Sequence, residues 1–302
     1  AVVAGCLGDQ ARYLHTTREN VTQGCRLVDF REEHSHATQQ ELFAAEGAAI
    51  FEGIDRVLFV EDEITTGKTI LNFIEALKKS GCIRENIKIS AASLLNGMKE
   101  EHREEFAKRG IELVTLVRLD SSVIAKEIAG VTMGEWGDDT GVTQGTPLHK
   151  LTVEGALQPR LGVNIGDYVK ACGDLARQVA ASVCAKEGER IAVIGTEECM
   201  FPALWLGREL EKAAPGAVVR THATTRSPIV PSEKEDYPIR RRKKVRSPYE
   251  ADRATFLYNQ DAYDKVIILT DAPADCEEAF VSIAAGFVQL GAKEIWGVRW
   301  KS

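Results

Sequence analysis

The sequence predicts an α/β protein made of two Rossmann-like domains, each built on a parallel sheet. Short apolar runs rich in Val, Ile and Leu alternate with longer segments of helical periodicity. This alternation stops in a Gly-rich stretch near the middle of the chain and then resumes. A chain of 302 residues is also long enough to form two separate cores.

In the first half, three strands with helices between them are expected at Arg56–Val60, Ile87–Ser93 and Ile111–Val117. The apolar run of the first strand is typical of a strand covered on both faces of a parallel sheet. Ile70–Leu77 has the spacing of an amphipathic helix.

The start of the chain is expected to be a strand at Val2–Gly5. Only a few residues separate it from Arg12, whereas a helical crossover between parallel strands needs about a dozen residues. We therefore expect a segment to be missing between Gly5 and Arg12, and the absent initiator Met indicates an incomplete start.

Residues 131–158 are expected to be a long connection, because Gly134, Gly137, Gly141 and Gly145 interrupt them without periodicity. The predicted domains are therefore 1–130 and 159–302. In the second domain, helices are expected at Ile165–Glu187, at Ala203–Ala214 and in a segment ending near Gln289, and strands at Arg190–Ile194, Ala217–Thr221, Lys265–Thr270 and Ile295–Trp300.

The most specific pattern lies where the first expected strand ends. Glu61 and Asp62 precede a hydroxyl-rich loop, Thr65–Thr69, which opens a helix. Backbone N–H groups, threonine hydroxyls and the positive end of a helix suit a phosphate. The two carboxylates repel a phosphate and are better suited to sugar hydroxyls, directly or through a divalent cation. Together they predict a ribose 5-phosphate site.

This segment has two other interpretations. The Gly-Lys-Thr sequence suggests an ATP-binding P-loop, but the P-loop pattern requires Gly where this chain has Asp62. The segment could also be an ordinary strand-turn-helix in which threonines cap the helix. Two adjacent acids before Thr-Thr-Gly-Lys-Thr favour the sugar-phosphate site over both.

The same segment resembles the phosphoribosyl pyrophosphate motif of type I phosphoribosyltransferases: four apolar residues, two acids, two further positions and T-[TS]-G-x-T. The resemblance implies that Glu61 and Asp62 hold the ribose 2- and 3-hydroxyls as catalytic residues. It also implies phosphoribosyl pyrophosphate as a substrate, Mg²⁺ as a cofactor bound through that diphosphate and through Glu61 and Asp62, and a homodimer. The implied contacts of the 5-phosphate are Thr65, Thr66, Gly67, Lys68 and Thr69, where Lys68 replaces the small residue often found in the family.

Residues 16–38 occupy the interval that holds the flexible pyrophosphate loop in the family. The resemblance implies that Thr16, Thr17 and Arg18 contact pyrophosphate, and a guanidinium suits the charge that grows on a leaving diphosphate. The remaining candidates in this interval are Glu33, His34, Ser35 and His36. The two histidines share a face if the segment is a strand, which permits a metal site, but loop hydrogen bonding or proton transfer to the base or leaving group is favoured.

The second half contains Thr225-Arg226-Ser227-Pro228 and flanking segments that resemble the TRSP domain, a C-terminal partner of phosphoribosyltransferase domains in bacterial tellurium-resistance and stress gene clusters. Val266–Pro273 repeats the plan of the acidic motif, so the second domain is either a degenerate copy of the first or an unrelated Rossmann-like domain. Arg226 is interpreted either as an anion clamp or as part of an ordinary turn. The candidate residues here are Thr196, Glu197, Glu198, Thr225, Arg226, Ser227 and Asp271.

Composition excludes several classes of function. The net charge of −7 argues against nucleic acid as the main partner, and the basic run Arg240–Lys244 is interpreted as a solvated loop, with RNA or phosphate binding as the alternative. No apolar run approaches transmembrane length and no signal peptide is visible, which predicts a cytoplasmic protein. The seven scattered cysteines are expected to be free thiols in the core.

The sequence thus predicts Mg²⁺-dependent transfer of a 5-phosphoribosyl group between pyrophosphate and a nitrogenous base, with Glu61, Asp62 and Arg18 as catalytic residues. The alternative is a non-catalytic regulator that binds the sugar diphosphate or a nucleotide, or an RNA-binding protein on the same fold. A third interpretation has the second domain act on the product of the first, which requires two nucleotide-sized sites.

Overall fold

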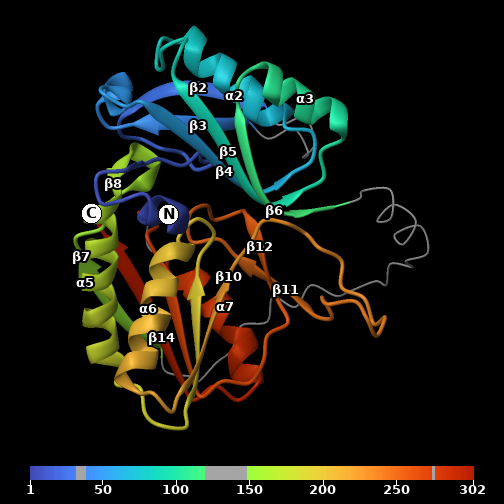
Figure 1. Cartoon of the computed structure of the whole chain (residues 1–302). Helices are drawn as coiled ribbons and strands as arrows, with labels where there is room; N and C mark the ends of the chain where they lie inside the picture. The colour runs from blue at the N-terminus through green and yellow to red at the C-terminus, as the bar shows by residue number, and fades with distance from the viewer. Residues whose placement is uncertain (32–38, 120–147, 274–275) are drawn as a thin grey trace. The chain divides into compact units, whose positions relative to one another are not determined.

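The structure is a computed structural model that describes residues 1–31, 39–119, 148–273 and 276–302 (Figure 1). The chain divides into two compact units. The described residues of the N-terminal unit are 3–31, 39–119 and 158–165, and those of the C-terminal unit are 1–2, 148–157, 166–273 and 276–302. Parallel sheets in both units confirm the predicted α/β class.

The N-terminal unit is built on a three-stranded parallel sheet in the order β4-β5-β6. These strands are Arg56–Ile64, Lys88–Asn96 and Glu112–Arg118. Helix α2 (Lys68–Lys79) connects β4 to β5, and helix α3 (Glu100–Lys108) connects β5 to β6. The three predicted strands and the predicted amphipathic helix are thus confirmed.

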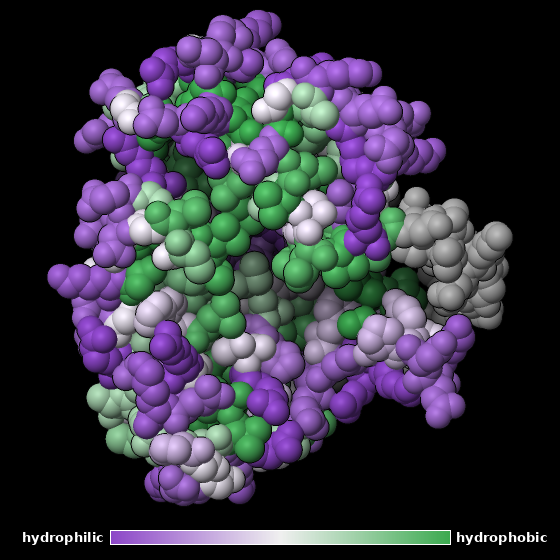
Figure 2. All heavy atoms as spheres, in the orientation of Figure 1, coloured by the Kyte–Doolittle hydropathy of each residue, from purple (hydrophilic) through white to green (hydrophobic). Residues whose placement is uncertain are grey.

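Both helices cover the same face of this sheet. Each crossover leads to the next strand in the same direction, and right-handed crossovers of that kind place their helices on one side. Phe59, Ile74 and Phe106 are buried in the core beneath them. On the other face, Val60 is 51% exposed and Leu116 is 77% exposed, so the expectation that the first strand is covered on both faces is wrong. Figure 2 shows that green, apolar side chains lie among purple, polar ones on one face of the molecule.

Short elements complete the N-terminal unit. Strands β2 (Cys25–Arg31) and β3 (Gln39–Ala44) form an antiparallel pair, and β1 (Arg12–Tyr13) pairs with β8 (Val163–Asn164). The 3-10 helices are η1 (Gly47–Phe51) and η2 (Pro159–Leu161).

The start of the chain differs from the prediction. Val2–Cys6 forms helix α1, so the expectation of a strand at Val2–Gly5 is wrong. A short apolar run cannot by its period distinguish a helix from a strand. The argument for a missing crossover depended on that strand and therefore loses its premise.

The C-terminal unit is built on a five-stranded parallel sheet in the order β10-β9-β13-β14-β7 (Figure 1). The strands are β7 (Leu148–Glu154), β9 (Arg190–Gly195), β10 (Val218–Ala223), β13 (Lys265–Thr270) and β14 (Glu294–Lys301). The helices are α5 (Ile165–Val183), α6 (Met200–Ala213) and α7 (Glu277–Gln289). The four strands and three helices predicted for this half are confirmed.

The strand order reverses direction between β9 and β13. From β9 the chain passes through α6 to β10 on one side, and from β13 it passes through α7 to β14 on the other. The carboxyl ends of β9 and β13 are therefore neighbours at a topological switch point, where ligands bind in open α/β sheets. The core strands on both sides of this point are fully buried, as at Ile194 and Ile268.

Two parts of the second half differ from the sequence expectations. Part of the expected connection, Leu148–Glu154, is the edge strand β7 of the five-stranded sheet, whereas residues 158–165 group with the N-terminal unit. Residues 131–147 of the same expected connection lie outside the described residues.

Only part of the basic run is the expected solvated loop, because Arg240 and Arg241 are exposed and lie outside the strands. Arg242–Arg246 forms strand β11, which pairs with β12 (Ala254–Tyr258) and packs against α7. Strand alternation buries Lys243 and places Arg246 in an ion pair with Glu278. None of the helices within the described ranges is long and apolar enough to cross a membrane.

Candidate functional site

The acidic motif lies inside a strand. Strand β4 continues past the predicted end at Val60 and includes Glu61, Asp62 and Glu63, all of which are exposed. Successive side chains of a strand point to opposite faces, so the Cβ atoms of Glu61 and Asp62 lie on different sides of the sheet. The Oδ1 atom of Asp62 accepts a 2.9 Å hydrogen bond from the N–H of Glu63, which fixes that carboxylate at the strand end.

The loop after β4 requires glycine at one position. Gly67 is the N-cap of α2 and has a left-handed backbone with φ 74°. A Cβ atom at Gly67 would lie 2.5 Å from the Phe106 ring and 3.1 Å from Met98, so this loop sits directly against α3 and the residues before it. Only a residue without a Cβ atom satisfies both the dihedral angle and the contact.

The N-cap residue of α2 is Gly67, which has no side chain that could cap the helix. The Thr66 hydroxyl accepts a 3.4 Å hydrogen bond from the N–H of Lys68, and the N–H of Leu71 bonds the Gly67 carbonyl. The Thr66 bond is one that the interpretation of threonines as helix caps expects. The positive end of α2 remains suited to an anion held by backbone groups.

Ser93 is a residue of this site that sequence reasoning missed. It faces Glu61 in the register of β4 and β5, so both side chains lie on the helix-covered side of the sheet. Its Oγ atom is buried and has no hydrogen-bond partner among the described residues. Buried hydroxyls are normally bonded, so a ligand or a water is expected beside it. The available signal was weak: Ser90 and Ser93 are the two polar residues of the otherwise apolar segment Ile89–Leu95.

The residues predicted upstream of the motif have different environments. Thr17 is buried, its backbone bridges Glu41 of β3, and its hydroxyl accepts a 2.9 Å bond from the N–H of Glu19. Thr16 and Arg18 flank it and are partly exposed. The predicted Glu33, His34, Ser35 and His36 lie outside the described residues.

The described part of the chain has no group of three or more His, Cys, Asp and Glu side chains placed to hold a metal ion. Glu61 and Asp62 nevertheless supply exposed carboxylate oxygens, which are the donors Mg²⁺ prefers. The donor set therefore fits a cation that arrives bound to a diphosphate and takes one or two protein ligands.

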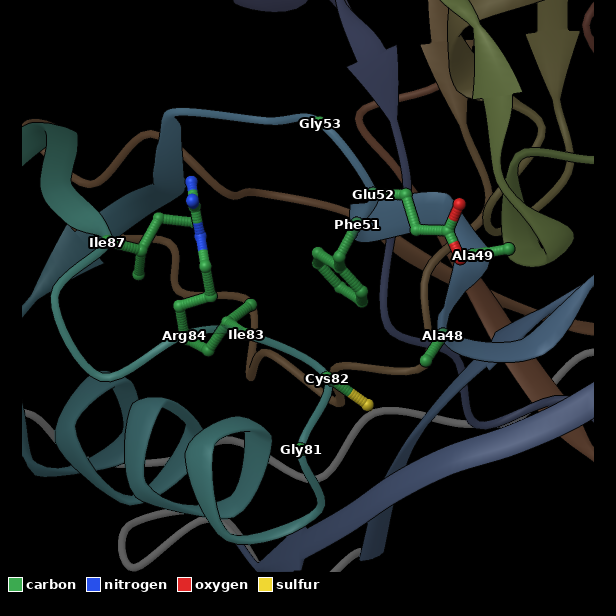
Figure 3. Close-up of a pocket in the computed structure, with 10 residues that line it drawn as sticks. All are labelled: Ala48, Ala49, Phe51, Glu52, Gly53, Gly81, Cys82, Ile83, Arg84 and Ile87. Carbon is green, nitrogen blue, oxygen red and sulfur yellow. The ribbon is translucent and has the colours of Figure 1, made fainter.

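A pocket of about 410 Å³ lies elsewhere in the N-terminal unit (Figure 3). It is lined by η1 and by the turn between α2 and β5, with the Phe51 ring reaching into it and Cys82 and Arg84 along its side. This is the amino end of β4 and β5, whereas Glu61 and Asp62 lie toward the carboxyl end of β4. The pocket is therefore not part of the predicted sugar-phosphate site.

In the C-terminal unit, the structure brings the predicted residues together around Glu197. This residue follows β9, has a left-handed backbone with φ 45°, and its side chain is only 2% exposed. Oε2 of Glu197 accepts hydrogen bonds from Arg226 Nε at 2.6 Å and Arg253 Nη1 at 3.1 Å. Oε1 accepts a 2.5 Å bond from the Ser247 hydroxyl, and the N–H of Glu197 donates to the Thr224 hydroxyl at 3.0 Å.

The network continues to β13. The Tyr249 hydroxyl donates to Asp271 and lies 3.3 Å from the Thr196 hydroxyl, which in turn donates to Thr270 at 2.8 Å. Gly195 permits the tight turn before Thr196, since a Cβ atom there would lie 2.6 Å from the Cys199 carbonyl oxygen.

Of the seven residues predicted in this half, Thr196, Glu197, Arg226 and Asp271 belong to the network directly. Glu198 lies 3.9 Å from Arg226. The backbone of Thr225 bridges Phe256 of β12, and the Ser227 carbonyl accepts a bond from Tyr258, so these two residues position Arg226. The network also includes Thr224, which sequence reasoning placed beside Arg226, and the residues that were missed are Ser247, Tyr249, Arg253 and Thr270. A second Arg-Ser-Pro sequence, Arg246–Pro248, was the signal that could have found Ser247.

Comparison with known proteins identifies both halves of the chain. Residues 1–126 match the family model PRTase_2, described as phosphoribosyl transferase. Residues 158–289 match the model described as the TRSP domain C-terminal to PRTase_2. The two matches occur in the order that the sequence motifs predict. Neither the curated proteins nor the solved structures contain a match.

Proposed function

We propose that this chain, which carries a phosphoribosyl transferase domain of the PRTase_2 family followed by a TRSP domain, transfers a 5-phosphoribosyl group between pyrophosphate and a nitrogenous base. One observation carries the proposal: the exposed acids of β4 run directly into a glycine-dependent loop at the start of α2. Acids and cradle occupy adjacent positions, as the hydroxyls and the 5-phosphate of one ribose phosphate require.

In this proposal the backbone of Thr65–Thr69 and the start of α2 bind the 5-phosphate, with Lys68 adding positive charge. Glu61 and Asp62 accept hydrogen bonds from the ribose hydroxyls and so fix the ring while positive charge develops at its anomeric carbon. The buried Ser93 hydroxyl beside Glu61 supplies a further polar contact. Glu61 and Asp62 would hold a Mg²⁺ ion together with the diphosphate, and that ion would supply positive charge to neutralise the leaving group.

The first test is calorimetric titration of the full chain with phosphoribosyl pyrophosphate, with and without Mg²⁺. Saturable, Mg²⁺-dependent binding is expected for the wild type and for Glu63→Gln. Asp62→Asn is expected to weaken binding at least tenfold, since a hydrogen bond to a charged group is typically worth about 1.5–3 kcal/mol. No binding by a folded wild-type protein, or equal loss in the Glu63 and Asp62 variants, would overturn the proposal.

Binding and turnover are separated by a second measurement. Bases are screened for pyrophosphate release from phosphoribosyl pyrophosphate by the wild type and by Asp62→Asn. Release that depends on one base and is lost in the variant supports a transferase. Tight binding without release for any purine, pyrimidine or nicotinic base would favour the alternative, a regulator that senses the sugar diphosphate.

A further inference from the structure

We propose that the C-terminal unit holds a second ligand site, built around Glu197, for a phosphate ester that carries sugar hydroxyls. This inference goes beyond the transfer reaction, since it concerns residues of the other unit. It rests on the network geometry, the position of the network in the sheet, and the balance of charges within it.

The position in the sheet is the first argument. Four segments that are distant in sequence meet at the carboxyl ends of β9 and β13, and every one contributes polar side chains: 196–198, 224–227, 247–253 and 270–271. This is the topological switch point, the usual ligand position in an open parallel sheet.

The second argument is that stability alone does not account for the arrangement. A non-glycine residue with φ 45° is strained, and backbone strain of this kind gathers at functional sites. A buried carboxylate with two guanidinium partners is also a poor way to stabilise a fold, because the desolvation of the charges offsets their attraction. What the arrangement does achieve is to fix the orientation of Arg226 and Arg253.

Two guanidinium groups of fixed orientation suit a phosphate, because their planar donor forks match phosphate oxygens. Glu197 contacts both arginines through the same oxygen, Oε2, and this fixes their spacing. The turn that carries Arg226 is pinned at both ends, by Thr225 to Phe256 and by Ser227 to Tyr258.

The charge balance narrows the ligand class. Glu198 lies 3.9 Å from Arg226, and Glu250 pairs with Arg253 through Nη2 at 2.5 Å. Asp271 accepts a hydrogen bond from the Tyr249 hydroxyl at the far end of the network. These carboxylates disfavour a bare anion at the arginines, and they are good acceptors for hydroxyl groups. A ligand that has both a phosphate and hydroxyls satisfies both sets of groups, and inorganic phosphate satisfies one.

The experiment is hydrogen–deuterium exchange on the full chain, because it reports each site separately. Ribose 5-phosphate is the probe, and inorganic phosphate at the same concentration is the comparison. Ribose 5-phosphate is expected to slow exchange in residues 195–200 and 224–228, and phosphate to have a smaller effect there. Asp62→Asn is expected to leave this protection unchanged while altering only the segment around residues 61–69, so failure of one site does not conceal the other.

Variants provide the specificity control. Arg226→Lys and Arg253→Lys keep the charge and lose the planar fork. For each variant, the concentration of ribose 5-phosphate that gives half-maximal protection is expected to rise about tenfold. Arg246 begins the second Arg-Ser-Pro sequence, but it is exposed and pairs with Glu278. Arg246→Lys is therefore expected to have no effect on the protection. Absence of protection in a folded wild type, equal effects in the three variants, or equal binding of phosphate and ribose 5-phosphate would each overturn the proposal.

Discussion

The Oε2 atom of Glu197 lies 2.6 Å from Nε of Arg226, and the same oxygen lies 3.1 Å from Nη1 of Arg253. One buried carboxylate therefore holds two cationic side chains from different loops. Without that carboxylate, the two guanidinium groups would lose the acceptor that they share. The stability of this region consequently depends on Glu197 more than on either arginine.

Glu197→Ala is expected to lower the free energy of unfolding by about 3–5 kcal/mol, the cost of breaking a buried ion pair from one side. Urea unfolding measures it. Glu278→Ala is the matched control: it removes an exposed partner of Arg246, with Glu278 80% exposed, and is expected to cost less than about 1 kcal/mol. Equal costs for the two variants would show that the Glu197 cluster is not a buried charge cluster in solution.

Gly67 and Gly81 separate the effect of backbone angle from the effect of space. Their φ values are 74° and 73°, but a Cβ atom at Gly67 would meet the Phe106 ring at 2.5 Å, whereas a Cβ atom at Gly81 would meet nothing within 4 Å. Gly81→Ala is expected to cost about 1 kcal/mol. Gly67→Ala is expected to cost more and to abolish the binding of phosphoribosyl pyrophosphate, which thermal unfolding and calorimetry will test. Similar stabilities and unchanged binding would contradict the proposed loop geometry.

Much of the fold follows from the sequence, because the buried parallel strands are written as clear, continuous apolar runs. Runs such as Ile191–Ile194 and Val266–Leu269 are fully apolar and are fully buried in the structure. The prediction failed where the pattern is short or mixed. Val2–Cys6 has too few residues to show a period, and Arg242–Arg246 alternates buried and exposed positions although all but one of its residues are basic.

The candidate sites were predictable to different degrees. Glu61, Asp62 and the loop to Thr69 form one continuous stretch, so a local pattern could identify them. The site around Glu197 takes Tyr249 and Arg253 from a connection between two strands that the sequence did not reveal. Residues that meet only through tertiary packing leave no local signal, and Ser93 likewise gains its importance from the strand register with Glu61.

Lys265 is expected to be a stability determinant of the C-terminal unit. Its buried Nζ atom donates to the Val183 and Cys184 carbonyls at the end of α5, both at 3.1 Å, and lies 3.3 Å from Glu189. Lys265→Met would leave these acceptors without a donor and is expected to cost about 3 kcal/mol in urea unfolding. Lys293→Met removes a lysine that is 77% exposed and pairs with Asp264, and should cost less stability than Lys265→Met. A larger loss for Lys293→Met would refute this ranking.

The cysteines should divide into two reactivity classes. All seven are free, and the expectation of core thiols is confirmed for Cys82, Cys172, Cys199 and Cys276 but wrong for Cys6, Cys25 and Cys184, which are exposed. Burial raises the pKa of Cys172 to about 12, so its reactive thiolate is scarce at neutral pH. Titration of the native protein with a thiol reagent should label three cysteines rapidly, and the others should react only after denaturation. Rapid labelling of Cys172 in the native protein would contradict its burial.

His222 should make the C-terminal unit less stable in mild acid. Burial lowers the pKa of this histidine, against an opposing effect of Asp261, and its Nε2 lies 3.1 Å from the Tyr263 hydroxyl. The unfolded chain therefore takes up the proton first as the pH falls through about 6.5, and the folded state loses stability below that pH but not above it. His222→Gln removes the group that takes up the proton and keeps a polar group near Tyr263. The variant should therefore resemble the wild type at pH 8 and lose less stability than the wild type at pH 5.5. Urea midpoints at the two pH values measure the difference, and an equal loss in both proteins would show that His222 does not contribute to the acid sensitivity.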